Sequence, residues 1–253
     1  MIIELRIKNC FSFEDQIVFS MKADMRNKKF ASNVHRENNF NILKTAGIYG
    51  PNNAGKTCLV KCFNAIKKIL LNKKPNLMPN LFSKNSVCEL GITFLAEGRE
   101  FSYDLHYDAQ KEEFLYEKFS EIQKDQYGNE KEIFWLIKDS VEGQYACTDK
   151  DEVPMMPLMA KNNLLCYLID TSKFKHLEEM KKIIIDFAGK IDVINMIPMK
   201  HTIEMMKNKG QLQQKVVDFI KNADLYMDNF EYVDMDQIKL KADDEEKPDE
   251  DEK

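Results

Sequence analysis

The sequence predicts an α/β fold that contains a phosphate-binding loop, and three adjoining segments lead to this prediction. Residues 42–49 form a short, mostly apolar run that is typical of a buried strand. Residues 50–57 follow at once, and their letters GPNNAGKT match the pattern G-x-x-x-x-G-K-[ST]. An amphipathic helix comes next, since one helical face carries Leu59, Phe63, Ile66 and Leu70. Strand, loop and helix therefore occur in the order that such a loop requires.

Composition narrows the class of protein further. The chain has 253 residues, of which 43% are hydrophobic and 31% are charged, which suffices for one or two domains with a buried core. No apolar run approaches the roughly 18 residues of a membrane-spanning helix. The N-terminus carries Glu4 and has no long apolar stretch, so a secretory signal is not expected. Six cysteines without a Cys-x-x-Cys pair suggest reduced thiols, and we expect a cytoplasmic protein without a membrane partner.

The net charge of −5 comes entirely from the C-terminal tail. Residues 241–253 contain eight acidic residues and three lysines, and this segment has almost no apolar side chains to bury. Removing them from the totals of 42 acids and 37 bases leaves 34 of each sign in residues 1–240. We therefore expect a disordered acidic tail over residues 236–253 and a neutral folded part. A neutral body neither requires nor excludes a nucleic-acid partner.

The remaining elements were assigned from periodicity. Residues 2–9 and 16–21 read as two short strands, whereas the polar, basic segment 22–39 reads as a loop. Alternating apolar residues predict an antiparallel meander with strands near 87–95, 101–107, 114–122 and 133–137. The predicted organisation is thus a hairpin and phosphate-binding core with a mixed sheet around the loop (1–85), an antiparallel β subdomain (86–148), a helical section (149–235) and the tail.

Each residue type in the loop suits a phosphate. Glycines at 50 and 55 permit backbone angles that side chains forbid and allow close approach to phosphate oxygens. Successive amides at a helix N-terminus bind anions, Lys56 can reach the β- and γ-phosphates, and the Thr57 hydroxyl can bind Mg²⁺. The expected nucleotide-binding residues are Gly50, Pro51, Asn52, Asn53, Ala54, Gly55, Lys56 and Thr57.

The neighbourhood of the loop resembles a known family. Residues 5–13, LRIKNCFSF, are similar to the "x-I-x-N-F-x-S-F" start of ABC-type AAA ATPases related to SMC and OLD-family proteins. Residues 49–57 look like their Walker A motif, the predicted meander is similar to their antiparallel subdomain, and residues 220–230 are similar to a region of the RloA-like group. The resemblance implies an α/β P-loop NTPase fold, specifically an ABC-ATPase-like N-terminal lobe with an antiparallel β subdomain and a helical C-terminal section.

The resemblance also implies a function. In such ATPases two heads enclose ATP and Mg²⁺, and Walker B carboxylates and a signature motif complete the site. It implies that Asn9 and Ser12 approach the nucleotide, that a second ATPase lobe or a homodimer completes the site, and that the role lies in bacterial genome maintenance or anti-phage defence. A nucleic-acid partner is left open.

The parts needed for hydrolysis are not found in the sequence. Two apolar runs end in an aspartate, at Asp170 and Asp186, but neither is followed by glutamate, and both runs read more readily as helices. No Ser-Gly-Gly signature is present. We therefore expect nucleotide binding with hydrolysis that needs a second lobe in trans, and the catalytic residues stay unknown. The alternatives are a non-catalytic interaction protein that retains a P-loop fold, as a truncated or degenerate ATPase, and an unrelated nucleotide kinase.

Other features of the sequence carry weaker expectations. The four histidines are far apart and show no metal-ligand spacing. Lys67, Lys68, Lys73 and Lys74 near the end of the predicted helix suit its dipole and need no nucleic acid. Methionines gather between residues 155 and 206, where they either fill a core or form a docking surface for another lobe.

Overall fold

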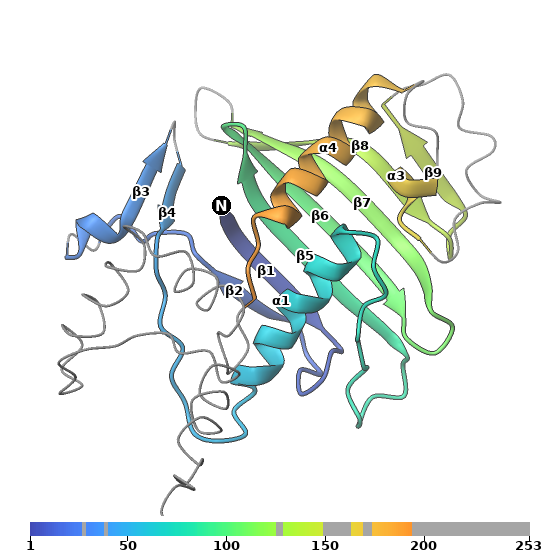
Figure 1. The fold of residues 1–253 in the computed structure, drawn as a ribbon, viewed down its shortest axis with the longest axis horizontal. Helices are drawn as coiled ribbons and strands as arrows, with labels where there is room; N and C mark the ends of the chain where they lie inside the picture. Colours follow the sequence, from blue (N-terminus) through green and yellow to red (C-terminus); the bar gives the residue numbers. More distant parts are fainter. Residues whose placement is uncertain (27–28, 38–39, 125–128, 149–162, 169–173, 194–253) are drawn as a thin grey trace, which may run out of the picture. The chain divides into compact units, whose positions relative to one another are not determined.

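Alternating apolar and polar residues build one large antiparallel sheet. A computed structural model describes residues 1–26, 29–37, 40–124, 129–148, 163–168 and 174–193, all within the first of two units, which spans residues 1–193. Seven strands in this unit follow the order β2-β1-β5-β6-β7-β8-β9, and neighbours pair antiparallel throughout (Figure 1). They are β1 (Ile2–Lys8), β2 (Ile17–Ser20), β5 (Val87–Ala96), β6 (Arg99–Asp108), β7 (Glu113–Lys124), β8 (Glu130–Asp139) and β9 (Gln144–Cys147).

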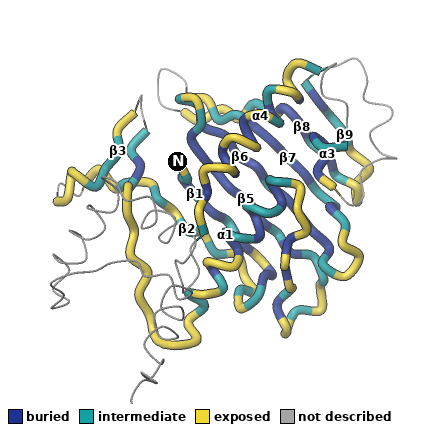
Figure 2. Tube along the Cα trace, viewed as in Figure 1, coloured by how far each residue is buried: buried dark blue, intermediate teal, exposed yellow. Residues whose placement is uncertain are grey.

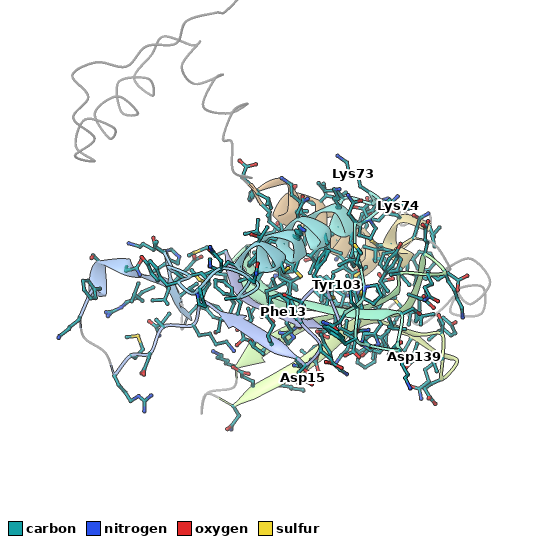
Figure 3. All side chains as sticks on the ribbon, turned by 90° about the horizontal axis from the view of Figure 1, so that it is seen from below. Phe13, Asp15, Lys73, Lys74, Tyr103 and Asp139 are labelled. Atoms are coloured by element: carbon teal, nitrogen blue, oxygen red, sulfur yellow. The ribbon has the colours of Figure 1, made fainter. Side chains whose placement is uncertain are left out.

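Two long helices cover one face of this sheet (Figures 1 and 3). Helix α1 (Lys56–Leu70) and helix α4 (Lys175–Gly189) each bury one apolar stripe, as their sequence periodicity predicts. The rings of Phe94 in β5 and Phe187 in α4 stack with centroids 3.8 Å apart. The hydrophobic core therefore lies between the helices and this face of the sheet.

A cluster of polar side chains around Glu117 lies within the core. Glu117 in β7 and Lys138 in β8 are register partners, and neither is accessible to solvent. The hydroxyl of Tyr103 donates a hydrogen bond to the Glu117 carboxylate, and the amide of Leu165 donates another at 2.8 Å. Leu165 begins the short helix α3 (Leu165–Leu168), so the carboxylate fastens that helix to the sheet. Burial raises the pKa of Glu117 and lowers the pKa of Lys138.

The opposite face of the sheet carries polar side chains that hydrogen-bond to one another across neighbouring strands. The guanidinium of Arg6 donates to Asp104 at 2.9 Å, to Thr93 at 2.7 Å and to Ser102 at 2.9 Å. Gly91 makes room for this network, because a Cβ there would lie 2.2 Å from the Asp104 carboxylate. Alternation along β1 thus sends Leu5 and Ile7 into the core and Arg6 to the polar face.

The strand predicted over residues 42–49 is wrong in its extent and in its place. Strand β4 (Phe40–Leu43) ends at residue 43 and pairs with β3 (Val34–Glu37) in a separate two-stranded sheet. Residues 44–50 are irregular and exposed (Figure 2), and Tyr49 is 95% exposed. The backbone amide of Lys44 donates to Asn33 in the short helix η1 (Ala31–Asn33), and the amide of Leu43 donates to the carbonyl of Met21 just beyond β2, so β4 ends beside the large sheet without becoming one of its strands. An apolar run by itself therefore fixes neither burial nor a partner strand.

Two further expectations need correction. The predicted mixed sheet around the phosphate loop is not found among the described residues, where the strand pairings are antiparallel. Residues 22–39 are not wholly a loop, since η1 and β3 lie within them. What the structure shows is a mixed α/β protein with a mostly antiparallel sheet, and the P-loop NTPase fold stays a prediction.

Other predicted elements agree with the structure. The N-terminal hairpin is present as β1 and β2, and the meander is present as β5 to β8, with β5 paired to β1 so that both belong to one sheet. Of the predicted helical section, α3 and α4 are described. Residues 149–162, 169–173 and 194–253 lie outside the described residues. They include residues 220–230, the acidic tail and, apart from Met180, the methionines between residues 155 and 206. No helix in the described part of the chain is long and apolar enough to span a membrane.

Candidate phosphate-binding site

Helix α1 begins at Lys56, where the motif predicts it. Gly55 is the N-cap residue, with φ of 88°, and no side chain caps the helix there. The first helical hydrogen bond runs from the amide of Leu59 to the carbonyl of Gly55. The amides of the first turn therefore have no intrahelical acceptor, and with no acidic residue in that turn they are suited to an anion.

The side chain of Lys56 folds back over the loop. Its Nζ donates to the carbonyl oxygens of Gly50 and Pro51, both at 2.7 Å. A second contact inside the loop runs from the amide of Ala54 to the Pro51 carbonyl, at 3.3 Å. Asn53 has φ of 67° and Gly55 also has a positive φ, so the loop turns sharply before the helix begins. The ammonium and the first-turn amides are thus held at one end of α1.

Glycine is needed at position 55 for two separate reasons. Its positive φ is a conformation that side chains rarely adopt. In addition, a Cβ there would lie 3.0 Å from Ser12 Oγ and 3.1 Å from the ring of Phe13. Gly50 is less constrained, because a Cβ there would meet only the Cβ of Ala54, at 3.4 Å. The motif's two glycines are therefore not equivalent in this structure.

The turn after β1 braces the loop from one side. Ser12 lies against Gly55, and the approach of Ser12 to a nucleotide stays a prediction. Asn9 has another role: it is 5% exposed, and its side-chain amide donates to the carbonyls of Asn85 and Val87. Asn9 also accepts from the amide of Asn80, so its hydrogen-bonding capacity is used in holding two loops together. Sequence reasoning missed Phe13 and Asn80, because their contacts depend on the pairing of distant segments.

The remaining candidates from the sequence are the Mg²⁺ ligand Thr57 and the two aspartates considered for Walker B. Thr57 is exposed in the first turn of α1. Asp186 lies on the exposed side of α4, which confirms the helical reading of residues 183–187 and argues against a Walker B strand there. Asp170 lies outside the described residues. Within the described ranges, no group of three or more His, Cys, Asp or Glu side chains could hold a metal ion.

The residues of the 50–57 loop fit a nucleoside triphosphate with Mg²⁺. The loop offers amides and an ammonium group for phosphate oxygens, and Thr57 offers one hydroxyl ligand, which is enough where the phosphates themselves supply further oxygens to the metal. A cleft of about 410 Å³ elsewhere, between the start of β1 and the end of α4, shares no lining residue with the loop. The loop, which combines the motif with matching geometry, is therefore the candidate site.

A comparison with models of known protein families finds no match, and no curated protein is detectably similar in sequence. The function of the chain is therefore inferred from the loop and the residues around it.

Proposed function

We propose that this protein binds ATP with Mg²⁺ through residues 50–57. One observation carries the proposal: a loop with the complete phosphate-binding motif ends in an uncapped helix N-terminus, with the Lys56 ammonium held above it. Neither the motif alone nor an uncapped helix N-terminus alone would be enough to propose a nucleotide-binding site. Their coincidence at the same residue supports the proposal.

The geometry suggests how the lysine would act. An ammonium group has three N–H donors. Two of them are directed at the carbonyls of Gly50 and Pro51, which leaves one for a phosphate oxygen. Because the carbonyls fix the position of Nζ, little side-chain entropy remains to be lost on binding. The amides of the first turn would contact the same phosphates, and the Thr57 hydroxyl would ligate Mg²⁺.

The broader role follows from the resemblance. We propose an ATP-binding N-terminal lobe of an ABC/SMC-like ATPase, in bacterial genome maintenance or anti-phage defence, which needs a second lobe for hydrolysis. The second candidate is an interaction protein that binds nucleotide without turning it over. It is favoured by the exposed position of Asp186 on helix α4, because a Walker B aspartate would follow a buried strand.

Thermal unfolding with and without Mg-ATP tests nucleotide binding. A ligand at about 100 times its Kd stabilises the native state by about 2.7 kcal/mol. For a domain of this size that corresponds to a rise in Tm of roughly 5–11 °C. Lys56→Ala should abolish the rise, whereas Lys73→Ala, which removes an exposed charge beyond the far end of α1, should retain it. An equal rise in wild type and Lys56→Ala would exclude the loop as the site.

Phosphate release separates the two candidates. The purified chain is expected to bind ATP without appreciable release of phosphate, because phosphoryl transfer needs charged groups from several segments. Turnover by the chain alone, lost in Lys56→Ala, would show that it carries its own catalytic carboxylate. Turnover that appears only when a second ATPase lobe is added would favour the first candidate.

A further inference from the structure

A buried carboxylate lies on the polar face of the sheet. Glu100 in β6 shares this face with Ser102, because side chains two positions apart in a strand point the same way. Glu100 is only 2% exposed, and its Oε1 atom accepts no hydrogen bond from any residue that the structure describes. Burying an ionised carboxylate without hydrogen bonds costs much more than burying its protonated form. Burial accordingly raises the pKa of Glu100.

The charges around Glu100 do not supply a counter-ion for it alone. Two lysines attract its ionised form and two glutamates repel it: Lys22 just after β2, Lys124 in β7, Glu4 in β1 and Glu130 in β8. Each lysine already pairs with one of these glutamates, since Nζ of Lys22 lies 3.5 Å from Glu4 and Nζ of Lys124 lies 3.7 Å from Glu130. A charge on Glu100 would therefore have to share both lysines, whereas a proton removes that need.

Strand β4 contacts the residues that surround this carboxylate. Ile42 in β4 packs in a small apolar cluster with Leu95, the register partner of the buried glutamate in β5. The two lysines adjoin the same strand: Lys22 forms a backbone bridge with Ile42, and the Lys124 ammonium lies 5.3 Å from the centre of the Phe40 ring. Strand β4 itself carries no titratable side chain. We infer that β4 is what shields the carboxylate from water.

The β3–β4 hairpin is also the part of this site that is least firmly attached. It forms a separate two-stranded sheet (Figure 1). Two backbone hydrogen bonds and one bridge join β4 to residues 21–23, which follow β2. A two-stranded hairpin is marginally stable by itself in water, so its position depends on the contact with the large sheet. Local opening of such a segment needs less free energy than global unfolding.

We propose that the β3–β4 hairpin is a proton-controlled flap, which is closed over the sheet while Glu100 carries a proton and opens as Glu100 ionises. Opening gives the carboxylate access to water, where a glutamate has its ordinary pKa of about 4.3. Closure is therefore strongest below that value and weakens as pH rises through the raised pKa of the closed form. Across this interval the equilibrium constant for opening rises by up to about tenfold per pH unit. The flap does not depend on nucleotide binding, because none of its residues lies in the 50–57 loop.

Amide hydrogen exchange of the full chain, without nucleotide and between pH 4 and 8, tests the proposal. Mass spectrometry of peptides that cover β3 and β4 gives their protection, after correction for the intrinsic pH dependence of chemical exchange. Wild-type protection of residues 40–43 should fall with rising pH, by up to about tenfold per pH unit. Glu100→Gln keeps the shape of the side chain but cannot ionise, so its protection should stay constant. Wild-type protection that does not change with pH, or a Glu100→Gln protein that loses protection as wild type does, overturns the proposal.

Two further variants separate the flap from a general loss of stability. Glu117→Gln removes another buried glutamate, on the face beneath the helices, and the hairpin should respond to pH as in wild type. Lys22→Met removes a charge that favours ionised Glu100, so the loss of protection should move to higher pH. A response abolished by Glu117→Gln, or one that Lys22→Met leaves in place or moves to lower pH, overturns the assignment to Glu100. Lys56→Ala should respond like wild type, so the flap and ATP binding are measured independently.

Discussion

Replacing Gly55 by alanine tests the loop geometry most directly. The substitution adds a methyl group at a residue with φ of 88° and brings it to 3.0 Å from Ser12 Oγ and 3.1 Å from Phe13. A left-handed conformation costs an ordinary residue about 1–2 kcal/mol. Forcing a methyl group into packed surroundings costs about 1–3 kcal/mol more. Together these predict a loss of roughly 2–5 kcal/mol in the free energy of unfolding.

The assay is thermal unfolding of wild type, Gly55→Ala and Gly50→Ala. For a domain of this size the predicted loss corresponds to a fall in Tm of roughly 4–20 °C. Gly50→Ala is the matched control, because its new methyl group would make only an ordinary contact with Ala54. Its Tm should stay within about 2 °C of wild type, as is usual for uncrowded surface positions. Adding Ser12→Gly to Gly55→Ala should recover part of the loss, since one of the two crowded neighbours is removed. A Gly55→Ala protein as stable as Gly50→Ala would refute the described packing of the loop against the turn.

Two further predictions concern stability. Asn9→Ala should lower the free energy of unfolding by about 3 kcal/mol, because it leaves the buried Asn80 amide without its acceptor and removes two donated hydrogen bonds. Urea unfolding measures this loss as a shift of the midpoint with an unchanged slope. A loss below about 0.5 kcal/mol would contradict the assigned role of Asn9. Burial raises the pKa of Glu117 in the folded protein. The contribution of this residue to the free energy of unfolding is therefore complete below its pKa in the unfolded chain, which is about 4.3. That contribution is lost as pH rises through the pKa of the folded state. Glu117→Gln cannot titrate, and the stability advantage of wild type over this variant should therefore shrink as pH rises from about 4 to 7; a constant difference in urea midpoints over that range would count against the buried carboxylate.

Local signals in the sequence determined the start of the phosphate loop's helix and its buried face. Lys56 begins α1 because Asn53 and Gly55, both with positive φ, turn the chain before it. Leu59, Ile66 and Leu70 are buried as their spacing predicts. The N-terminal hairpin and the meander were also predictable, since alternation over a few residues defines a strand's two faces. These features need only neighbours along the chain.

Pairing between distant segments was beyond the sequence. The apolar residues before the loop indicated a strand, but which strand they join depends on competition among all the strands, and here β4 pairs with β3 and ends at Leu43. Asn9 illustrates the same limit, because its part in joining two loops exists only when residues 9 and 80 meet. The sequence gives each residue's type. The residue's contact partner depends on which fold of the whole chain forms its hydrogen bonds and buries its apolar surface best. The sequence by itself thus determined a loop suited to phosphate, and only the tertiary structure decided that Gly55 of this loop lies against Ser12 and Phe13, in the turn between two strands of an antiparallel sheet.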